Sequence, residues 1–565
     1  MKDINVSSHT TAKSKQKKKT ENSFILQGSI LAAAAIIAKI IGLLYRVPLT
    51  NILGDSGNSY YSTANEIYTM ILMVSSFSLP LAVSRLMSER INRGEYRNAN
   101  KVFLCALRFA VVAGGIASLL TYALAGLLTK YVMNFELAKY GLRVIAPAIL
   151  IFAITGTFRG FFQGFGNMVP TAASQVIEQI VNAVLSVVCA GIMFRYGMGL
   201  VAKGGDELLA PAWGAAGGTF GTVGSVTIAM IFMMVLYSMN RRSFARSIEK
   251  DETERRESEQ MIYRALILTI LPIVASALVY NMTTVVDQGI FNAVLKSQGF
   301  TEKQYSIVWG IYVGKFRVLM NVVLSLASSL GPAIVPAMTA SMSRRDRKDA
   351  AAKVALAIRF TMIFSIPCAF GLAALGGPIV IMLFHPESGI PLTAGIMQAG
   401  ALMIILYALS TLTTAILQGM GNFREPLINC CIAMVAHIVL AYILLRSFKL
   451  YIYAIIYANI FFAFVICVLN ARVISRELKY RQEVYRTFFV PTVASAIMAF
   501  VVLGVYSLLH HFMGVTVPVI IAILFGVAVY TVSLVAFKGI TAAELLEIPK
   551  GRYILRLFRK LGLMR

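Results

Sequence analysis

Charged side chains inside long apolar stretches are the residues of this sequence that could do chemistry. Lys39 and Arg46 lie in the first apolar stretch. Lys315 and Arg317 lie in another, in the second half of the chain. A charge within a membrane span costs a few kcal/mol, so it needs a partner, a water-filled cavity or a route to the headgroups. Lysine and arginine pair well with phosphate, so these cations indicate a binding site for an anionic, phosphate-bearing group.

Polar side chains accompany these cations at a similar depth. We interpret Glu66, near the start of the second span, and Asp287, near the outer end of the seventh, as counter-ions or ion-coupling carboxylates. Asn321 follows Arg317 by four residues and therefore lies on the same helix face. The alternative is that the charges form salt bridges between two lobes, or that Arg46 and Glu66 lie in the outer interface. The excess of cations over carboxylates favours a phosphate-bearing substrate over a cationic drug.

No pattern in the sequence indicates catalysis or a resident metal. There is no P-loop, nucleophile elbow, HExxH or paired acid and base spacing. The six cysteines lie in or beside apolar stretches without CxxC or Cys/His spacing, which is typical of small buried side chains. We therefore expect no enzyme, no metal site and no cofactor. The residues leave open whether the protein couples to the membrane potential, Na+ or H+.

The elements that must position these side chains are membrane helices. The chain has 565 residues, a hydrophobic content of 58% and a mean hydropathy of +0.74. Its apolar stretches exceed the roughly 18 residues that mark a spanning helix. We predict an all-α polytopic membrane protein with about 14 transmembrane helices. The predicted spans are 24–45, 61–88, 102–128, 140–160, 170–194, 212–239, 264–290, 306–340, 354–384, 393–418, 426–446, 452–472, 487–510 and 516–537.

The net charge of +26 sets the expected orientation. In a soluble protein it would suggest nucleic acid, but Lys and Arg also resist translocation and collect in cytoplasmic loops. Most basic residues fall in segments that lie inside if both termini are cytoplasmic. We therefore expect anionic membrane lipids, and no nucleic acid, as partners. The first 22 residues are polar and lysine-rich, so we expect no cleavable signal peptide.

An internal repeat divides the spans into two lobes. Residues 163–167, Gln-Gly-Phe-Gly-Asn, return 255 positions later as Gln-Gly-Met-Gly-Asn at 418–422, and each copy precedes a proline. Six spans are assigned to each lobe, so both lobes enter the membrane in the same direction. This predicts a pseudo-twofold axis along the membrane normal. The glycines at a helix end favour a tight turn with close backbone approach over a binding site.

The repeat and the charges together predict the domain organisation. The second half ends with two unpaired spans, and a basic segment joins the lobes. The expected parts are a disordered basic cytoplasmic tail at 1–22, an N-lobe at 23–240, a cytoplasmic linker at 241–262, a C-lobe at 263–474, the two extra spans at 475–540 and a basic cytoplasmic tail at 541–565.

These features resemble a known superfamily. The six plus six plus two arrangement, the duplicated motif and the residues from Lys39 to Pro48 resemble the multidrug/oligosaccharidyl-lipid/polysaccharide exporters over roughly residues 24–537. Within it, the chain is similar to the polysaccharide biosynthesis branch, which includes the stage V sporulation protein B-like proteins and the MurJ-type lipid II flippases. The resemblance implies a MATE-like fold in the bacterial plasma membrane. We expect a monomer.

The resemblance also bears on the candidate residues. Aligned on Gly42, the first-span pattern of the MurJ-type flippases places Lys39 at an arginine, Tyr45 at a second arginine and Arg46 at an aspartate. The eighth-span arginine of that family falls near Lys315 or Arg317, and the pattern does not choose between them. Its second-span arginine falls near Glu66, with the opposite charge.

A sodium site is the least consistent part of the resemblance. Some members bind sodium through an aspartate on the seventh span, for which Asp287 is the candidate, and another aspartate on the eleventh span. The eleventh span here contains Asn429 and His437 but no acid, which puts sodium coupling in doubt.

We therefore expect a flippase that moves an undecaprenyl-pyrophosphate-linked sugar, first of all lipid II, to the outer leaflet by alternating access. An exporter of another lipid-linked polysaccharide unit, for teichuronic acid, capsule or spore cortex, would look nearly the same in sequence. A cation-coupled multidrug antiporter should instead have carboxylates and aromatic residues in its cavity. A membrane scaffold without transport activity would tolerate neutralisation of the cations.

Overall fold

The computed structural model describes residues 4–76, 78–251, 253, 256–328, 331–384, 389–540, 553 and 556. Every regular element that these residues form is a helix, which confirms the all-α prediction. The elements are α1 (Ile4–Ser75), α2 (Leu79–Asn92), α3 (Tyr96–Leu127), η1 (Leu128–Val132), η2 (Glu136–Ala138), α4 (Lys139–Ile145), α5 (Pro147–Gly164), α6 (Val169–Ala202), α7 (Leu209–Glu249), α8 (Glu259–Ser297), α9 (Glu302–Ile311), η3 (Tyr312–Phe316), α10 (Arg317–Ser328), α11 (Gly331–Ser343), α12 (Arg347–Phe384), α13 (Ile390–Gly419), α14 (Arg424–Arg446), α15 (Ile452–Leu478), η4 (Tyr485–Phe489), α16 (Val490–His510) and α17 (Thr516–Ala536).

Twelve helical segments in the described part of the chain are long and apolar enough to cross a membrane. The first of them, Ala33–Asn92, contains most of the first two predicted spans. Helix α1 bends between these two spans at Gly54, where φ is 65°. The side-chain amide of Asn58 donates to the carbonyls of Thr50 and Gly54 across this bend. The predicted seventh span lies in α8, some of whose side chains are outside the described residues. The polytopic architecture is therefore confirmed, and about 14 is an approximate count.

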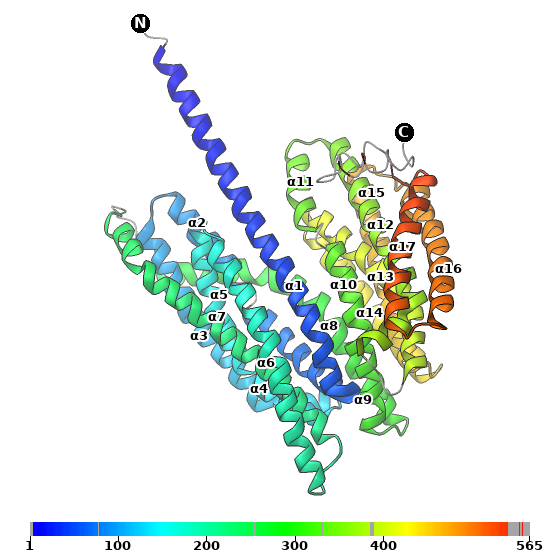
Figure 1. Ribbon diagram of the computed structural model, residues 1–565. Helices are drawn as coiled ribbons and strands as arrows, with labels where there is room; N and C mark the ends of the chain where they lie inside the picture. Colours follow the sequence, from blue (N-terminus) through cyan, green and yellow to red (C-terminus); the bar gives the residue numbers. More distant parts are fainter. Residues whose placement is uncertain are drawn as a thin grey trace. The chain divides into compact units, whose positions relative to one another are not determined.

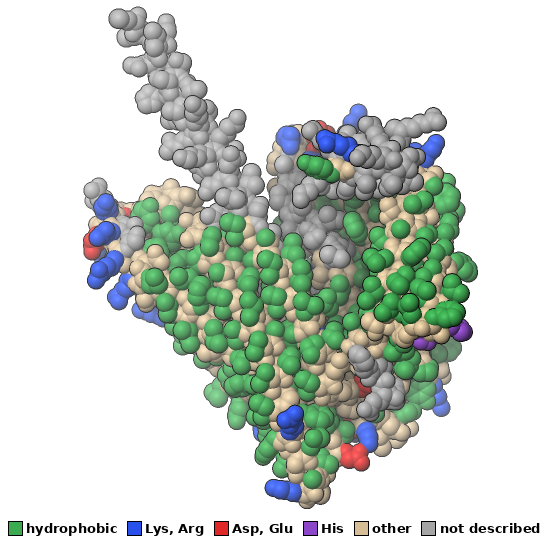
Figure 2. Space-filling view, viewed as in Figure 1, with side chains coloured by type: hydrophobic (Ala, Val, Ile, Leu, Met, Phe, Trp, Pro, Cys, Tyr) green, Lys and Arg blue, Asp and Glu red, His purple; other side chains and the backbone are tan. Residues whose placement is uncertain are grey.

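The outer faces of the helices are apolar, as a lipid environment requires. Figure 2 shows hydrophobic side chains over the visible helix faces and Lys and Arg mainly near the helix ends. Leu119 on α3, Ile192 on α6 and Phe500 on α16 are 69%, 60% and 79% exposed. Apolar patches of this extent are rare on soluble proteins but normal against lipid.

The chain divides into two compact units, Met1–Val285 and Val286–Arg565. The boundary falls within α8, not in the predicted linker. The reason is apolar burial: Ile262 and Leu266, on the first half of α8, are fully buried against Phe103 and Phe158 of the first unit. The predicted disordered tail is part of α1, whose helical backbone begins at Ile4. The predicted C-terminal tail lies almost wholly outside the described residues.

The two C-terminal spans are integral to the second unit. Figure 1 shows α16 and α17 side by side, and both pack on α12. Met498 of α16 and Tyr530 of α17 are buried in one cluster with Ile363 of α12. The Tyr530 hydroxyl donates to the Ile363 carbonyl at 2.8 Å. The two spans without a repeat partner are thus fixed to the second unit by core packing.

The duplicated motif has the same backbone geometry in both units. Helix α5 ends at Gly164 and α13 ends at Gly419, and the glycines two residues later have φ of 78° and 82°. The amide of Gly166 donates to Gln163, and that of Gly421 to Gln418, at 2.9 and 3.0 Å. This is the left-handed helix end that glycine permits. The expectation of a tight turn is confirmed.

The first glycine of each copy allows a close helix contact. A Cβ at Gly164 would lie 2.8 Å from the Cβ of Met87, and one at Gly419 would lie 2.9 Å from the Cβ of Met338. We expect Gly164→Ala and Gly419→Ala each to destabilise the protein by about 1–3 kcal/mol through overpacking. Thermal unfolding of the purified protein measures this loss. Gly504→Ala is the control, because that helical glycine has open space around it, and a similar loss there would contradict the argument.

An ion pair is also repeated. Arg108 of α3 contacts Glu259 at the start of α8 at 3.0 Å, and Arg359 of α12 contacts Glu483, just before η4, at 3.3 Å. Arg108-Phe109 and Arg359-Phe360 are a repeated dipeptide. In the first unit, Arg108 therefore contacts the start of α8, the helix that follows the first six predicted spans. In the second unit, Arg359 contacts the segment just before η4 and α16, which follow the second six. This placement supports the predicted duplication, although neither pair is deeply buried.

Part of the predicted linker is helical, and the rest is docked on the first unit. Helix α7 continues to Glu249, and α8 begins at Glu259. Between them, Glu257 pairs with Arg90, and its backbone carbonyl accepts from Lys101 at 2.6 Å. Asp251 accepts from the backbone N–H of Arg97 at 2.6 Å. The linker thus binds the end of α2 and the start of α3 within the first unit.

Asp251 should make this docking sensitive to acid. Burial alone would raise the pKa of its carboxyl, but hydrogen bonds from the backbone N–H of Arg97 and from Thr253 hold the pKa below its ordinary value. The docking is therefore stabilised above the unfolded pKa, about 3.9, and is lost as pH falls through the lower folded pKa.

Asp251→Asn mimics the protonated side chain. We expect about tenfold faster hydrogen exchange at the Arg97 and Thr253 amides, since each loses a charged acceptor. Hydrogen–deuterium exchange with mass spectrometry at neutral pH measures the effect. Glu249→Gln removes a nearby exposed carboxylate and serves as the control. Equal exchange in wild type and Asp251→Asn would show that the carboxylate does not hold the linker.

Candidate functional site

In the first unit, Arg46 lies on an aromatic surface. Its guanidinium carbon is 4.5 Å from the centroid of the Tyr61 ring, a cation–π geometry. Tyr61 is 2% exposed, so its ring is fixed by packing. The neighbouring Tyr45 accepts a hydrogen bond from Asn182 of α6 at 3.0 Å. Arg46 is half-buried, and the ring of Tyr61 positions its guanidinium group. A contact with the ring face leaves the N–H groups of Arg46 available for an anion.

The other candidates of the first unit have different environments. Lys39 is exposed on α1, seven residues before Arg46. Glu66 is half-buried and accepts from the Ser62 hydroxyl at 3.4 Å. The structure thus brings Arg46 together with Tyr61, a partner that the sequence reasoning missed. The sequence did contain a signal for this contact. Arg46 follows the end of the first predicted span, and the adjacent Tyr60 and Tyr61 lie at the start of the second.

A buried ion pair lies deeper in the same unit. Arg159 of α5 contacts Glu178 of α6 at 2.7 Å, and its Nε donates to the Ser174 hydroxyl at 2.9 Å. The two charged side chains are 7% and 15% exposed. Glu178 and Arg159 thus make a buried polar contact between α5 and α6.

The second unit contains a buried polar chain around Asp287. The Nε2 atom of His437 lies 3.0 Å from one carboxylate oxygen of Asp287. The side-chain amide of Asn459 donates to the other oxygen at 2.6 Å, and the Tyr407 hydroxyl donates to the Asn459 carbonyl oxygen at 2.6 Å. Asp287 and His437 are 3% and 0% exposed. Helices α8, α13, α14 and α15 thus converge on one carboxylate.

The surroundings of His437 complete this chain. Its ring packs edge-on against Phe462 at 5.6 Å between centroids. Both ring nitrogens are buried and have no hydrogen-bond partner among the described residues, so the 3.0 Å approach to Asp287 is a close contact without hydrogen-bond geometry. Buried polar atoms without a partner are costly, which marks this ring as a candidate functional group. Tyr407 and Asn459 were missed by the sequence reasoning, although an asparagine within an apolar span was a visible signal.

This arrangement differs from the pair of aspartates that the resemblance implies for sodium binding in some relatives. Sodium is a hard cation and prefers oxygen ligands, as Ca2+ and Mg2+ do. One oxygen of Asp287 accepts from Asn459, and the other lies 3.0 Å from Nε2 of His437 without hydrogen-bond geometry. His437 lies beside Asp287 on the helix where the resemblance implies a second aspartate.

Lys315 is the deepest of the cationic candidates. It lies in η3, a single π turn, and is 3% exposed. Phe316 beside it packs on Gly400 of α13, where a Cβ would lie within 2.2 Å of the ring. Single π turns within helices occur often at functional sites. Arg317 is half-buried and Asn321 is exposed, so burial distinguishes the two cations between which the sequence could not choose.

The fold and these charged groups define a class of protein: a helical membrane transporter of the MATE-like, two-lobed type. A solved inward-facing multidrug resistance MATE family transporter of the MOP superfamily covers 78% of this chain and 95% of its own, with a TM-score of 0.63 and 17% identity. The chain belongs to the polysaccharide biosynthesis protein family, whose model matches residues 25–342. A MatE model matches residues 313–443.

Individual relatives are consistent with this family. The lipid II flippase MurJ of Bacillus subtilis (strain 168) is 25% identical over 432 residues, which cover 74% of this chain and 77% of that protein. Stage V sporulation protein B of the same organism is 22% identical over 95% of this chain and 100% of its own. A solved inward closed structure of lipid II flippase MurJ covers 90% of this chain and 98% of its own, with a TM-score of 0.63 and 16% identity.

Proposed function

We propose that this protein moves a lipid-linked sugar pyrophosphate, with the peptidoglycan precursor lipid II as first candidate, from the inner to the outer leaflet. The observation that carries the proposal is Lys315, a cation buried in a span of a chain from the polysaccharide biosynthesis family. A diphosphate in hydrocarbon is prohibitively costly, so its path must offer cations and water. Arg46, positioned by Tyr61, supplies a second cation. No covalent bond forms or breaks in this step.

The experiment is complementation. Cells depleted of their own lipid II flippase receive this protein, and the lipid II accessible at the outer leaflet is measured with a membrane-impermeant probe. We expect accessible lipid II to return. Failure by a protein that reaches the membrane in normal amount would reject lipid II as the substrate.

The orientation belongs to the same proposal. The basic segments support cytoplasmic N- and C-termini in a bacterial plasma membrane, because Lys and Arg resist translocation. We also propose that the monomer is the transporting species. Labelling of a single cysteine placed in each terminus, with a membrane-impermeant reagent, tests the orientation in intact cells.

A second candidate is the export of another lipid-linked glycan, such as one used for the spore cortex. It is favoured by stage V sporulation protein B, with which this chain aligns over the full length of that relative. Complementation of a strain that lacks that relative distinguishes the two substrates. Restored spore formation without restored outer-leaflet lipid II would favour the second candidate.

Coupling to sodium is not part of the proposal, because both Asp287 oxygens face nitrogen atoms. We expect replacement of Na+ by K+ to change the flipping rate by less than about twofold, since no bound ion is lost. Flipping in proteoliposomes under an imposed membrane potential or pH gradient measures this. A strict requirement for Na+ would contradict the interpretation of Asp287 and His437.

A further inference from the structure

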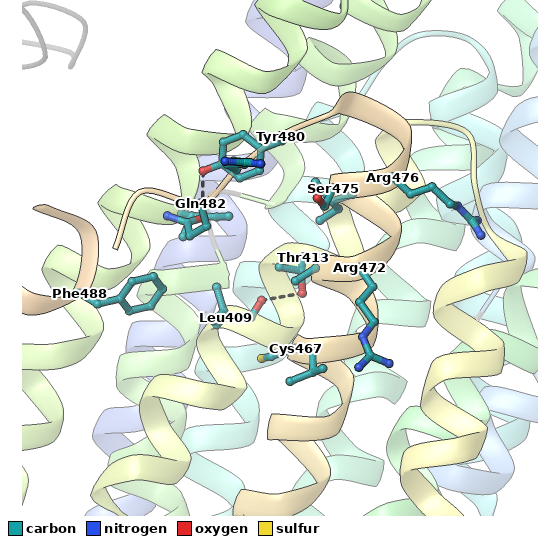
Figure 3. A pocket seen from close by; sticks show the side chains of 14 residues that line it. Leu409, Thr413, Cys467, Arg472, Ser475, Arg476, Tyr480, Gln482 and Phe488 are labelled. Atoms are coloured by element: carbon teal, nitrogen blue, oxygen red, sulfur yellow. Dashed lines mark hydrogen bonds between the residues drawn. The ribbon is translucent and has the colours of Figure 1, made fainter. Parts of the chain in front are cut away.

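A pocket opens in the second unit at one end of the spanning helices, within the part of the chain that is described. Its volume is about 730 Å3. Helices α12, α13 and α15, the loop after α15 and η4 line it. Figure 3 shows Tyr480, Gln482 and Phe488 on one side and Ser475 and Arg472 on α15 on the other. None of the proposed substrate cations is among its lining residues.

The lining combines an apolar interior with cations. Leu409, Val468 and Phe488 contribute apolar surface. Arg472 and Arg481 also line the pocket, and neither forms an ion pair among the described residues. An apolar pocket with unpaired arginines matches an amphipathic anion, because arginine binds phosphate well while hydrocarbon fills the rest.

The loop that forms one wall is held in place. The Tyr480 hydroxyl donates to Gln482 at 2.9 Å, and the Gln482 amide donates to the carbonyl of Glu483 at 2.9 Å. The Glu483 carboxylate in turn pairs with Arg359 of α12 at 3.3 Å. These contacts fix the wall without using Arg472 or Arg481, so both guanidinium groups stay available to a ligand.

The depth of the two arginines fits a lipid headgroup. Helix α15 has 27 residues and so extends about 40 Å, longer than the roughly 30 Å hydrocarbon core. Arg472 is six residues before its end, about 9 Å along the helix axis. Arg481 is three residues beyond the end. The pocket therefore crosses from the acyl region to the headgroup region, on the side that the basic residues assign to the cytoplasm.

We propose that this pocket binds one anionic glycerophospholipid of the cytoplasmic leaflet. The phosphate lies between Arg472 and Arg481, and an acyl chain fills the apolar part along Val468 and Phe488. A free phosphate would leave that apolar part wet, and a zwitterionic lipid would bring no net negative charge to the two arginines. Since α12, α13, α15 and η4 all contribute, the bound lipid joins the last two spans to the six-span set of this unit. The proposal does not depend on the transported substrate.

The test is native mass spectrometry of the full-length protein, delipidated and titrated with phosphatidylglycerol or phosphatidylcholine. We expect tight binding of one phosphatidylglycerol. The variant Arg472→Ala/Arg481→Ala should bind it at least about tenfold more weakly, since basic residues near the membrane surface attract anionic lipid headgroups. The control Arg424→Ala/Arg486→Ala removes the same charge from exposed arginines near the same end, which do not line the pocket.

Two further arms decide the source of the anion and guard against misfolding. Arg472→Lys/Arg481→Lys keeps the charge and should keep most of the binding, and thermal unfolding checks the fold of every variant. Inorganic phosphate should not displace the lipid at millimolar concentration. Equal binding of phosphatidylcholine, displacement by phosphate alone, or an equal loss in the control variant would each overturn the proposal.

Discussion

Lys315→Met should lower lipid II flipping at least about tenfold while the protein still folds, because methionine keeps the length of the buried side chain and removes its charge. If Lys315 neutralises the diphosphate during crossing, the loss falls on the transport step. Outer-leaflet lipid II in flippase-depleted cells measures the activity, and the amount of protein in the membrane measures its stability. Flipping is expressed per molecule of protein in the membrane, so a change in stability is not counted as a change in transport.

The matched control is Lys296→Met. Lys296 is an exposed lysine in the last turn of α8, so its loss removes the same charge from the same unit without touching η3. We expect normal flipping in this variant. Normal flipping by Lys315→Met as well would show that the buried ammonium only satisfies its local contacts, and the proposed role of η3 would be wrong.

Much of the fold could be predicted from the sequence because membrane spans and repeats leave local signals. Apolar length predicts helices in lipid, where backbone groups must bond within each helix. The duplicated motif at 163–167 and 418–422 predicted the two equivalent helix ends. The division within α8 could not be predicted, because it depends on which apolar face Ile262 and Leu266 bury against.

The candidate site was predicted less completely, and the reason is long-range pairing. Asp287, Arg46 and Lys315 were found because a charge in an apolar stretch is visible in one dimension. Their partners were not found, since Tyr61 and His437 are ordinary residues until packing brings them to Arg46 and Asp287. It stays a prediction that the candidate substrate-binding residues surround one cavity.

Disruption of the pair between Asp287 and His437 should have the largest effect on stability. Asp287→Ala removes the acceptor of Asn459 and the oxygen that His437 contacts, and His437→Phe removes the ring nitrogen that lies 3.0 Å from the buried carboxylate. Breaking a buried pair in this way costs about 3–5 kcal/mol, so the unfolding temperature of each single variant should fall clearly. Asn429→Ala is the matched control, because it removes a neutral buried contact with Asn470 between α14 and α15, the helices that carry His437 and Asn459. It should cost only about 1–3 kcal/mol.

The double variant Asp287→Asn/His437→Gln separates a structural role from a functional one. Both replacements are neutral and similar in size, so no buried charge is left unpaired and most of the stability should return. Transport should not return if the cycle needs the carboxylate of Asp287 inside the helices, because asparagine carries no charge. Thermal unfolding and flipping are measured on the same preparation. Recovery of both properties would mean that Asp287 and His437 serve packing alone, whereas recovery of stability without flipping places them in the transport cycle.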